Sequence, residues 1–159
     1  MNKIALGVSL LALSAGSVFA QTCATPLPIT SGGTPNGTVS GNTCTASNSL
    51  PGYGGTPSPQ NEIVYSFVAQ GANATIAIAE TGAAFGAGIF LMPSPCSVAT
   101  DVTALGFPGT PMAVNGLTNG QTYYVIVTAD PGGPANACGP FTATVTGPLP
   151  VELQNFSVD

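Results

Sequence analysis

Phe141-Thr142-Ala143-Thr144-Val145-Thr146 alternates without interruption between apolar residues and threonine. Successive side chains of a β-strand point to opposite faces, so this pattern predicts one face in a core and one face in water. Antiparallel sheets commonly have one buried and one solvated face. The segment 141–146 therefore predicts a half-buried strand of an antiparallel sheet.

Four further segments between residues 62 and 128 have strand-like patterns, and no segment after residue 20 has a helical one. The 21 glycines and 15 prolines are scattered between them, which indicates frequent turns. Short strands between such turns predict an all-β fold: an antiparallel β-sandwich of jelly-roll or immunoglobulin/fibronectin-like type. The segments are Glu62–Ala69, with Ile63, Tyr65 and Phe67 on one face; Ala74–Ala79, with Ile76 and Ile78; Ile89–Met92, apolar throughout; and Thr122–Thr128, with Tyr124 and Ile126 facing away from Tyr123, Val125 and Val127.

The segment Leu117–Tyr123 has the spacing of a tyrosine corner, in which a tyrosine that opens a strand bonds back to the preceding turn. A buried aromatic side chain without such a bond is the alternative. Asn119-Gly120 within it suits a tight turn, because both residue types tolerate positive φ.

Residues 1–20 are typical of a secretory signal peptide. Lys3 precedes the apolar run Ile4–Leu13, and Ser17-Val18-Phe19-Ala20 suits a signal peptidase, so cleavage would leave Gln21 first. The apolar run is shorter than the roughly 20 residues of a membrane-spanning helix. The sequence thus predicts export without membrane insertion after signal removal, with a sandwich domain at 21–147 and a linker and strand-like tail at 148–159.

Charge is scarce and almost wholly negative. The chain has six acidic residues, one basic residue and no histidine, and the basic residue, Lys3, lies in the predicted signal peptide. Without cations the mature protein cannot neutralise phosphates, which excludes binding to nucleic acid and attraction to anionic lipids. Two interpretations stay open: an ordinary polar secreted surface, or a surface whose weak mutual repulsion favours association.

The cysteines Cys23, Cys44, Cys96 and Cys138 all follow the predicted signal peptide, and an even number in an exported chain predicts two disulfides. Three pairings are possible. Cys23–Cys44 with Cys96–Cys138 closes the two most compact loops and is the expected one. A zinc site is disfavoured, because the cysteines are far apart and there is no histidine.

The residues of the common catalytic sites are missing. Nucleophilic catalysis with a histidine base has no histidine, and a serine–lysine pair has no lysine in the mature chain. The six carboxylates are dispersed, so no pair for glycoside hydrolysis is indicated. The sequence predicts no enzyme and no cofactor; a calcium site built from Asp101, Asp130 or Glu80 with backbone carbonyls is the alternative.

Two features suit binding. Tyr53 lies between glycines in the long segment 45–61 and could present an aromatic face to a sugar or a protein, or pack partly against the loop. After Pro148-Leu149-Pro150, the tail carries apolar residues in a strand-like pattern, which would form the last strand of this sandwich or pair with the sheet edge of a neighbour. The tail residues are Val151, Leu153, Phe156 and Val158.

Four segments in order resemble bacterial pre-peptidase C-terminal domains, over about residues 23–146. Pro28-Ile29-Thr30 and the following Gly/Thr-rich run resemble their opening, Glu62–Ala69 their "D-V-x-Y-S-F-x-A" strand, and Leu117–Val127 their "L-x-x-G-T-T-Y-Y-I-x-V" segment. Gly139–Val145 resembles the closing "G-x-F-T-L-T-V". The resemblance implies a β-sandwich accessory domain that binds substrate or matrix. The chain departs from this pattern in having no peptidase and no acidic calcium cluster, and residues 149–158 resemble a C-terminal segment of exported bacterial surface proteins.

These observations predict a non-catalytic protein of the cell surface or extracellular space that binds or adheres to a protein or polysaccharide surface. The alternative is a homopolymer: a subunit of an extracellular fibre or surface layer, joined by β-strand exchange.

Overall fold

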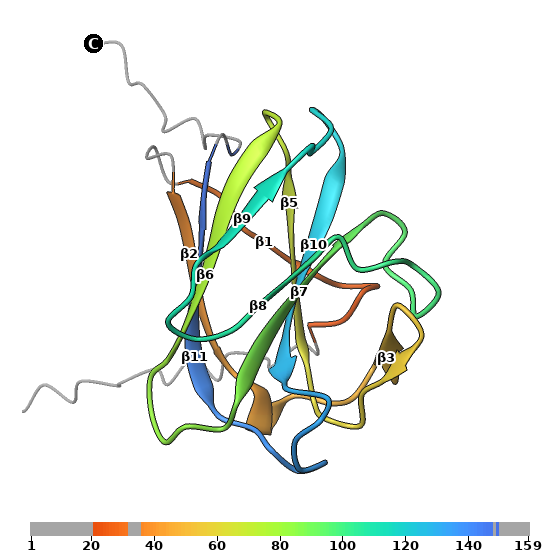
Figure 1. Ribbon diagram of the computed structural model, residues 1–159, viewed down its shortest axis with the longest axis vertical. Coiled ribbons are helices and arrows are strands. Elements are labelled where there is room, and N and C mark those ends of the chain that lie inside the picture. Colours follow the sequence, from red (N-terminus) through yellow and green to blue (C-terminus); the bar gives the residue numbers. More distant parts are fainter. Residues whose placement is uncertain (1–20, 32–35, 148, 150–159) are drawn as a thin grey trace, which may run out of the picture.

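The computed structural model describes residues 21–31, 36–147 and 149, and shows two β-sheets packed face to face (Figure 1). The described residues contain no α-helix, only the 3-10 turn η1 (Thr43–Thr45). No helix in this part of the chain is long and apolar enough to cross a membrane. The predicted signal peptide and the tail residues Val151, Leu153, Phe156 and Val158 lie outside the described residues.

One sheet has five strands in the order β1-β5-β10-β7-β8. All neighbours in it are antiparallel except β1, which pairs parallel with β5. The strands are β1 (Leu27–Pro28), β5 (Ile63–Val68), β10 (Thr122–Ala129), β7 (Ala87–Pro93) and β8 (Ala104–Gly106).

The second sheet is antiparallel and has four strands in the order β2-β11-β6-β9. A separate two-stranded hairpin lies beside the sandwich. The strands of the sheet are β2 (Asn36–Asn42), β11 (Pro140–Thr146), β6 (Asn73–Glu80) and β9 (Met112–Asn115), and those of the hairpin are β3 (Gly52–Tyr53) and β4 (Thr56–Pro57).

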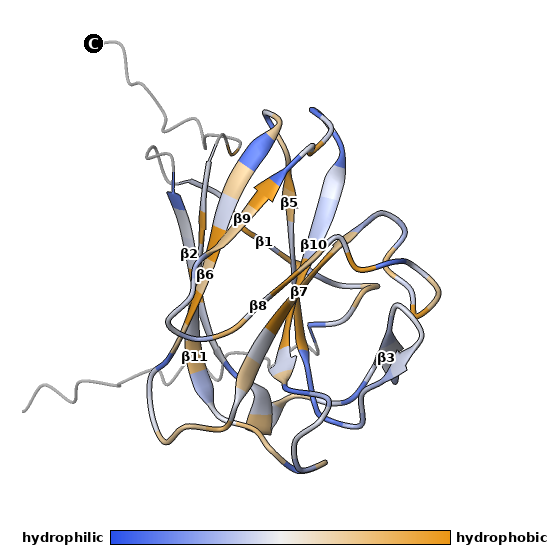
Figure 2. Ribbon diagram, in the orientation of Figure 1, coloured by the Kyte–Doolittle hydropathy of each residue, from blue (hydrophilic) through white to orange (hydrophobic). Residues whose placement is uncertain are grey.

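The main core lies between the two sheets, and the alternating segments supply it as predicted (Figure 2). On β11, Phe141, Ala143 and Val145 are buried, while the threonines between them face outward. On β10, Val125 and Val127 enter this core, and Ile126 points to the other face of the sheet. All five predicted strands and the β-sandwich fold are confirmed. Burial alternates with a period of two on β6 and β11, whereas β7 is buried on both faces, as its wholly apolar sequence predicts.

The predicted tyrosine corner is confirmed as well. The backbone N–H of Thr118 donates to the hydroxyl of Tyr123 at 3.0 Å, which ties the start of β10 to the turn before it. Tyr123 also stacks on Phe67, with ring centroids 5.8 Å apart. Gly120 in the turn has φ of +82°, a conformation that favours glycine.

All four cysteines form disulfides, but the expected pairing is wrong. The bridges are Cys23–Cys96 and Cys44–Cys138, which close loops with sequence separations of 73 and 94. The register of β2 with β11 pairs Asn42 with Pro140, so Cys44 and Cys138 lie opposite each other two residues beyond the end of the ladder. Strand pairing, and not the shortest loop, brings these cysteines together.

Candidate functional site

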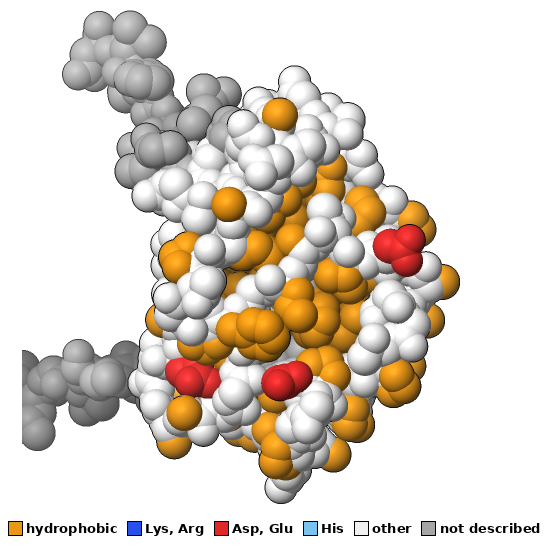
Figure 3. All heavy atoms as spheres, in the orientation of Figure 1, with side chains coloured by type: hydrophobic (Ala, Val, Ile, Leu, Met, Phe, Trp, Pro, Cys, Tyr) orange, Lys and Arg blue, Asp and Glu red, His pale blue; other side chains and the backbone are white. Residues whose placement is uncertain are grey.

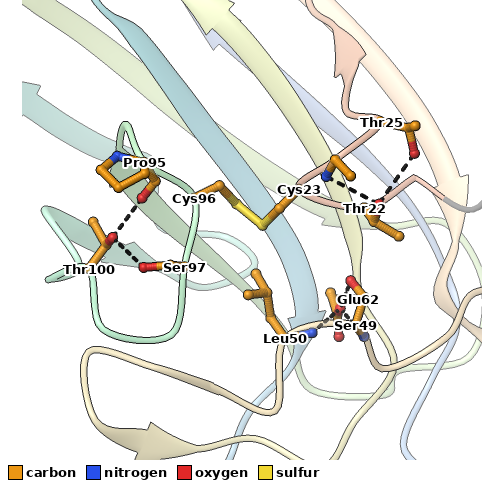
Figure 4. The surroundings of a disulfide bond; sticks show 11 residues. Thr22, Cys23, Thr25, Ser49, Leu50, Glu62, Pro95, Cys96, Ser97 and Thr100 are labelled. Atoms are coloured by element: carbon orange, nitrogen blue, oxygen red, sulfur yellow. Dashed lines mark hydrogen bonds between the residues drawn. A yellow bond between two sulfur atoms is a disulfide. The ribbon is translucent and has the colours of Figure 1, made fainter.

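The outer face of the five-stranded sheet carries a second apolar cluster, covered by the segment 45–61. Tyr53 on the hairpin stacks on Phe90 of β7, with ring centroids 4.4 Å apart. The Cys23–Cys96 disulfide packs against the same cluster and joins the N-terminal segment to the loop after β7 (Figure 4). These contacts and the disulfide hold the hairpin against the sheet. The buried members of the cluster are Leu50, Tyr53, Val64, Phe90, Met92 and Ile126.

The prediction that Tyr53 presents an aromatic face to a ligand is corrected by its burial. The side chain is 2% exposed, so it offers no ring surface on which a sugar could stack. The glycines beside it serve the hairpin instead: Gly54 and Gly55 have φ of +53° and +80°.

Beneath the hairpin lies a buried carboxyl group, Glu62, at the start of β5. Its Oε1 atom accepts hydrogen bonds from the backbone N–H groups of Ser49 and Leu50 and from the Ser49 hydroxyl (Figure 4). The bonds from the Ser49 hydroxyl and the Leu50 N–H are 2.6 and 2.8 Å long. Glu62 thus fixes the start of the loop that carries the hairpin.

The other oxygen of Glu62 has no such support. Oε2 is buried and makes no hydrogen bond to a described residue. The hydroxyl of Tyr53 is buried as well, near the side chains of Thr128 and Ser58. Burial raises the pKa of Glu62 above its ordinary value, against the opposing effect of its three hydrogen bonds. Burial, and then the charge of Glu62, also raises the pKa of Tyr53.

We expect Glu62→Gln to raise the free energy of unfolding at pH 7, because the amide avoids the cost of a buried charge. A carboxyl group whose folded pKa is raised contributes stability at low pH, which is lost as the pH rises from its unfolded pKa through its folded pKa. The amide cannot ionise and keeps an oxygen for the Ser49 and Leu50 donors. Urea denaturation from pH 3 to pH 8 should therefore show wild type and variant equal at pH 3 and diverging above it.

The control for this change is Asp101→Asn, the same substitution at an exposed carboxylate. It should leave both stability and its pH dependence nearly unchanged. A Glu62→Gln variant that is less stable than wild type at pH 7 would show that the buried carboxylate is ionised and held by its donors.

Two neighbouring hollows flank the hairpin on the outside. One, of about 470 Å³, lies between the hairpin and β8; the other, of about 260 Å³, lies between the hairpin and Val98. Thr56 lines both. The larger hollow has a mostly apolar lining with one carboxylate: Tyr53, Gly54, Thr56, Phe90, Asp101, Val102, Ala104 and Leu105.

Two exposed apolar side chains, Val98 and Leu105, line these hollows. Val98 is 42% exposed, Leu105 46% and Phe107, two residues further on, 44%. Figure 3 shows hydrophobic side chains gathered over β7 and β8, with the acidic groups of this face standing apart from one another. We name Val98, Asp101, Leu105 and Phe107, with the hairpin, the hairpin surface. The apolar members of this surface could not be predicted from the sequence, where their only signal is their place in the turn-rich stretch 94–111.

The three calcium candidates lie in different local settings. Glu80 accepts backbone N–H bonds from Phe85 and Ala87 at 3.0 and 2.9 Å, and Asp130 accepts one from Gly132 at 3.1 Å. Asp101 lines the larger hollow of the hairpin surface. Among the described residues, no three acidic or other ligating side chains come together as a metal site.

A further hollow, of about 540 Å³, lies at one end of the sandwich beside Cys138. Small residues of the loops 84–86 and 133–138 form most of its lining, with Phe85 and Asp130. No exposed large apolar residue borders it among the residues that the structure describes. The hairpin surface is therefore the stronger candidate for binding.

Comparison with known proteins establishes the fold. The sequence matches no protein-family model and no curated protein sequence. The structure resembles the periplasmic lysozyme inhibitor of g-type lysozyme, PliG, of Aeromonas hydrophila, with a TM-score of 0.52 and 15% identity over 76% of this chain and 93% of that one.

Two other solved structures are more distant. The Yersinia pseudotuberculosis-derived mitogen aligns with a TM-score of 0.47 and 10% identity over 78% of this chain and 92% of that one. The Salmonella Typhimurium PliG aligns with a TM-score of 0.43 and 14% identity over 77% and 98%. The likeness to the Aeromonas protein places the chain in a β-sandwich fold that is also found in the periplasm.

Proposed function

We propose that the protein is exported, has no catalytic activity, and acts by binding another protein through the hairpin surface, in recognition or adhesion. The observation that carries this proposal is the group of exposed apolar side chains around the two hollows. Large exposed apolar patches on soluble proteins commonly mark sites of interaction. Its two disulfides suit an oxidising compartment outside the cytoplasm.

The chemistry of the hairpin surface favours a protein partner over a polysaccharide. Sugar sites commonly present an exposed aromatic face inside the pocket, whereas the rings that line the larger hollow, Tyr53 and Phe90, are buried and the exposed Leu105 and Val98 are aliphatic. Phe107, the exposed aromatic residue of the hairpin surface, lines neither hollow. Asp101 adds a carboxylate to the larger hollow, and the chain has a net charge of −5. The expected partner therefore inserts an apolar side chain beside a basic group, since opposite charges steer association.

Titration with benzylammonium, an apolar ring with a cationic group, tests this surface by NMR. We expect shifts of the backbone amides of Val98, Asp101, Val102 and Leu105. Leu105→Asn should weaken binding about tenfold, because it removes apolar contact area. Asp101→Asn should weaken it about two- to fivefold, as expected for one exposed ion pair.

Leu27→Asn is the matched control. Leu27 is also exposed, at 42%, but it lies on β1, at the opposite edge of the sheet from β8. It should bind the probe like wild type. If a chitin or cellulose oligosaccharide shifts the same amides and benzylammonium does not, the proposal of a protein partner is wrong and the surface binds a polysaccharide.

Self-assembly is the second candidate function, favoured by one feature of the four-stranded sheet. Its edge strand β2 is seven residues long and contains neither a charged residue nor a proline. Edge strands without such residues readily pair with other strands. We propose the tail Val151–Val158 as a donor strand in this alternative; deleting residues 151–159 would then abolish filaments in electron micrographs and leave the domain folded.

The relationship to pre-peptidase C-terminal domains is likewise our proposal. The resembling segments coincide with β5, with β10 and its tyrosine corner, and with β11. This supports an accessory binding domain, and it is consistent with the protein-binding role proposed above.

A further inference from the structure

Among the described strands, β2 is the one long edge that nothing in its own sequence protects. The other edge strands are short: β1 has two residues including Pro28, β8 has three, and β9 has four and follows Pro111. Proteins usually block long edges with charge, proline or a bulge, because an open edge recruits another strand. β2 lies at one side of the sandwich, and its described strand neighbour is β11 alone (Figure 1).

The backbone of β2 is oriented for further pairing. In an antiparallel ladder, successive residues direct their N–H and C=O groups to opposite sides. Thr43, which continues the register of β2, donates its N–H to the carbonyl of Gly139 at 3.0 Å. Residues 39 and 41 therefore direct their backbone groups toward β11, and Thr38 and Ser40 direct theirs toward the open edge.

The inner side of β2 is seated firmly on the core. A Cβ atom at Gly41 would lie 2.8 Å from the Tyr65 hydroxyl oxygen and 2.9 Å from Cζ of Phe141. The Tyr65 hydroxyl donates to the Ser40 carbonyl at 3.2 Å, which leaves this carbonyl oxygen one lone pair for a further strand. Glycine thus lets the β2 backbone rest directly on aromatic side chains, so the edge is a rigid template and not a loose strand.

On the outer face, small hydroxyl side chains link β2 to β11. The hydroxyl oxygens of Thr38 and Thr144 are 3.2 Å apart, as are those of Ser40 and Thr142. A hydroxyl group both donates and accepts, so each can extend such a row to a further strand. Neither β2 nor β11 contains a charged residue.

The sequence of β2 is nearly its own mirror image. Asn36-Gly37-Thr38-Val39-Ser40-Gly41-Asn42 reads almost identically in both directions about Val39. If two β2 strands pair antiparallel about a two-fold axis at Val39, Thr38 faces Ser40 of the other copy, glycine faces glycine, and asparagine faces asparagine. Residues 38 and 40, whose backbone groups point to the open edge, then form the hydrogen-bonded pairs.

We propose that β2 is a homodimer interface: two copies join antiparallel through their β2 edges, with Val39 on the two-fold axis, into one continuous sheet. Such an isologous interface needs a surface that is complementary to itself, which the symmetry of this strand supplies. The two rows of hydroxyl groups, Thr144–Thr38 and Thr142–Ser40, would continue into the other copy. There, Thr38 of one copy faces Ser40 of the other across the interface. The inference is independent of the partner proposed for the hairpin surface.

Charge-swapped variants test the interface. The exported wild-type protein should have twice the monomer mass by light scattering after gel filtration at about 50 μM, well above typical dimer dissociation constants. T38E/S40E and T38K/S40K place like charges opposite each other across the axis, and each variant alone should be monomeric. An equimolar mixture of the two should form a 1:1 heterodimer, because each carboxylate of one variant then faces an ammonium group of the other.

The control A79E/A113E adds two carboxylates to exposed positions of the same four-stranded sheet, on strands β6 and β9. This variant should remain dimeric like wild type. Loss of the dimer in the control, or a mixture of the charge variants that stays monomeric, would contradict an interface at β2.

The register is tested by Val39→Cys, which also serves if the charged variants fail to fold. Facing residues of a non-hydrogen-bonded pair have Cα atoms about 4.5 Å apart, within disulfide range. Val39→Cys should therefore give a covalent dimer on a non-reducing gel, whereas Ala113→Cys on β9 should not. The proposal is overturned if wild type is a monomer, if Val39→Cys does not cross-link, or if deletion of residues 151–159 alone abolishes the dimer.

Discussion

Replacing Cys44 and Cys138 together by serine is expected to lower the free energy of unfolding by about 4 kcal/mol. The bridge spans a sequence separation of 94 and closes the end of the β2–β11 pair. In the chain-entropy description, a cross-link restricts the unfolded chain more as the closed loop grows, and a loop of this size corresponds to about 4–5 kcal/mol. Domains of this size have total stabilities of about 5–15 kcal/mol, so the loss is a large share. Urea denaturation measures it.

The second bridge provides the comparison. The C23S/C96S variant removes the bridge that spans a sequence separation of 73, and its free energy of unfolding should fall by nearly as much. Its bridge also packs against the cluster that holds the hairpin, so the hairpin amides should exchange faster with solvent in this variant alone. If reduction of both bridges leaves the denaturation midpoint unchanged, the disulfides do not stabilise the fold, and this account of them is wrong.

The strands that were easiest to predict are those in which apolar and polar side chains alternate. Phe141–Thr146 and Thr122–Thr128 place large apolar residues at every second position, and burial follows that period. β2 escaped prediction because two of its three inner positions are Gly37 and Gly41, which carry no apolar signal. Its place became visible only from the structure, in which Ile29, Thr30 and Leu149 lie against Gly37, and Ile63, Tyr65 and Phe141 lie against Gly41.

The disulfide pairing failed for the same reason. Without β2, nothing in the sequence places Cys44 near Cys138, and loop length favours the wrong partners. Once β2 pairs with β11, the pairing follows from register. Long-range pairing is thus the information that local patterns lacked.

The candidate site was harder to predict than the fold. Glu62 opens a strand, where a carboxylate commonly serves solubility or local hydrogen bonding; the structure shows the second role, in a side chain that is 1% exposed. Tyr53 had the signature of an exposed loop aromatic, but Phe90 covers it. Exposure depends on what packs above a residue, and the sequence does not encode that locally.

The second large effect is expected for Phe141→Ala, which should lower the free energy of unfolding by about 3–5 kcal/mol. Phe141 is 1% exposed and lies in the core between the two sheets, edge-on to Tyr65 with ring centroids 6.2 Å apart. Removing the ring leaves a cavity that rigid strands on both sides cannot close. It also removes one of the two aromatic rings that lie against Gly41, the other being Tyr65, so the packing of β2 on the core loosens.

Two variants separate the cavity from other causes of this loss. Phe141→Leu fills most of the space and should lower the free energy of unfolding by about 1–2 kcal/mol, whereas Thr142→Ala, one residue along on the outer face, should lower it by about 0.5 kcal/mol. If the dimer depends on the packing of β2 against Phe141, Phe141→Ala should raise the dimer dissociation constant. This is measured at denaturant concentrations where the monomer stays folded, and Thr142→Ala should raise the dissociation constant less. Equal destabilisation by Phe141→Ala and Thr142→Ala would mean that the two faces of β11 are not divided between core and solvent, and the sandwich as described would be wrong.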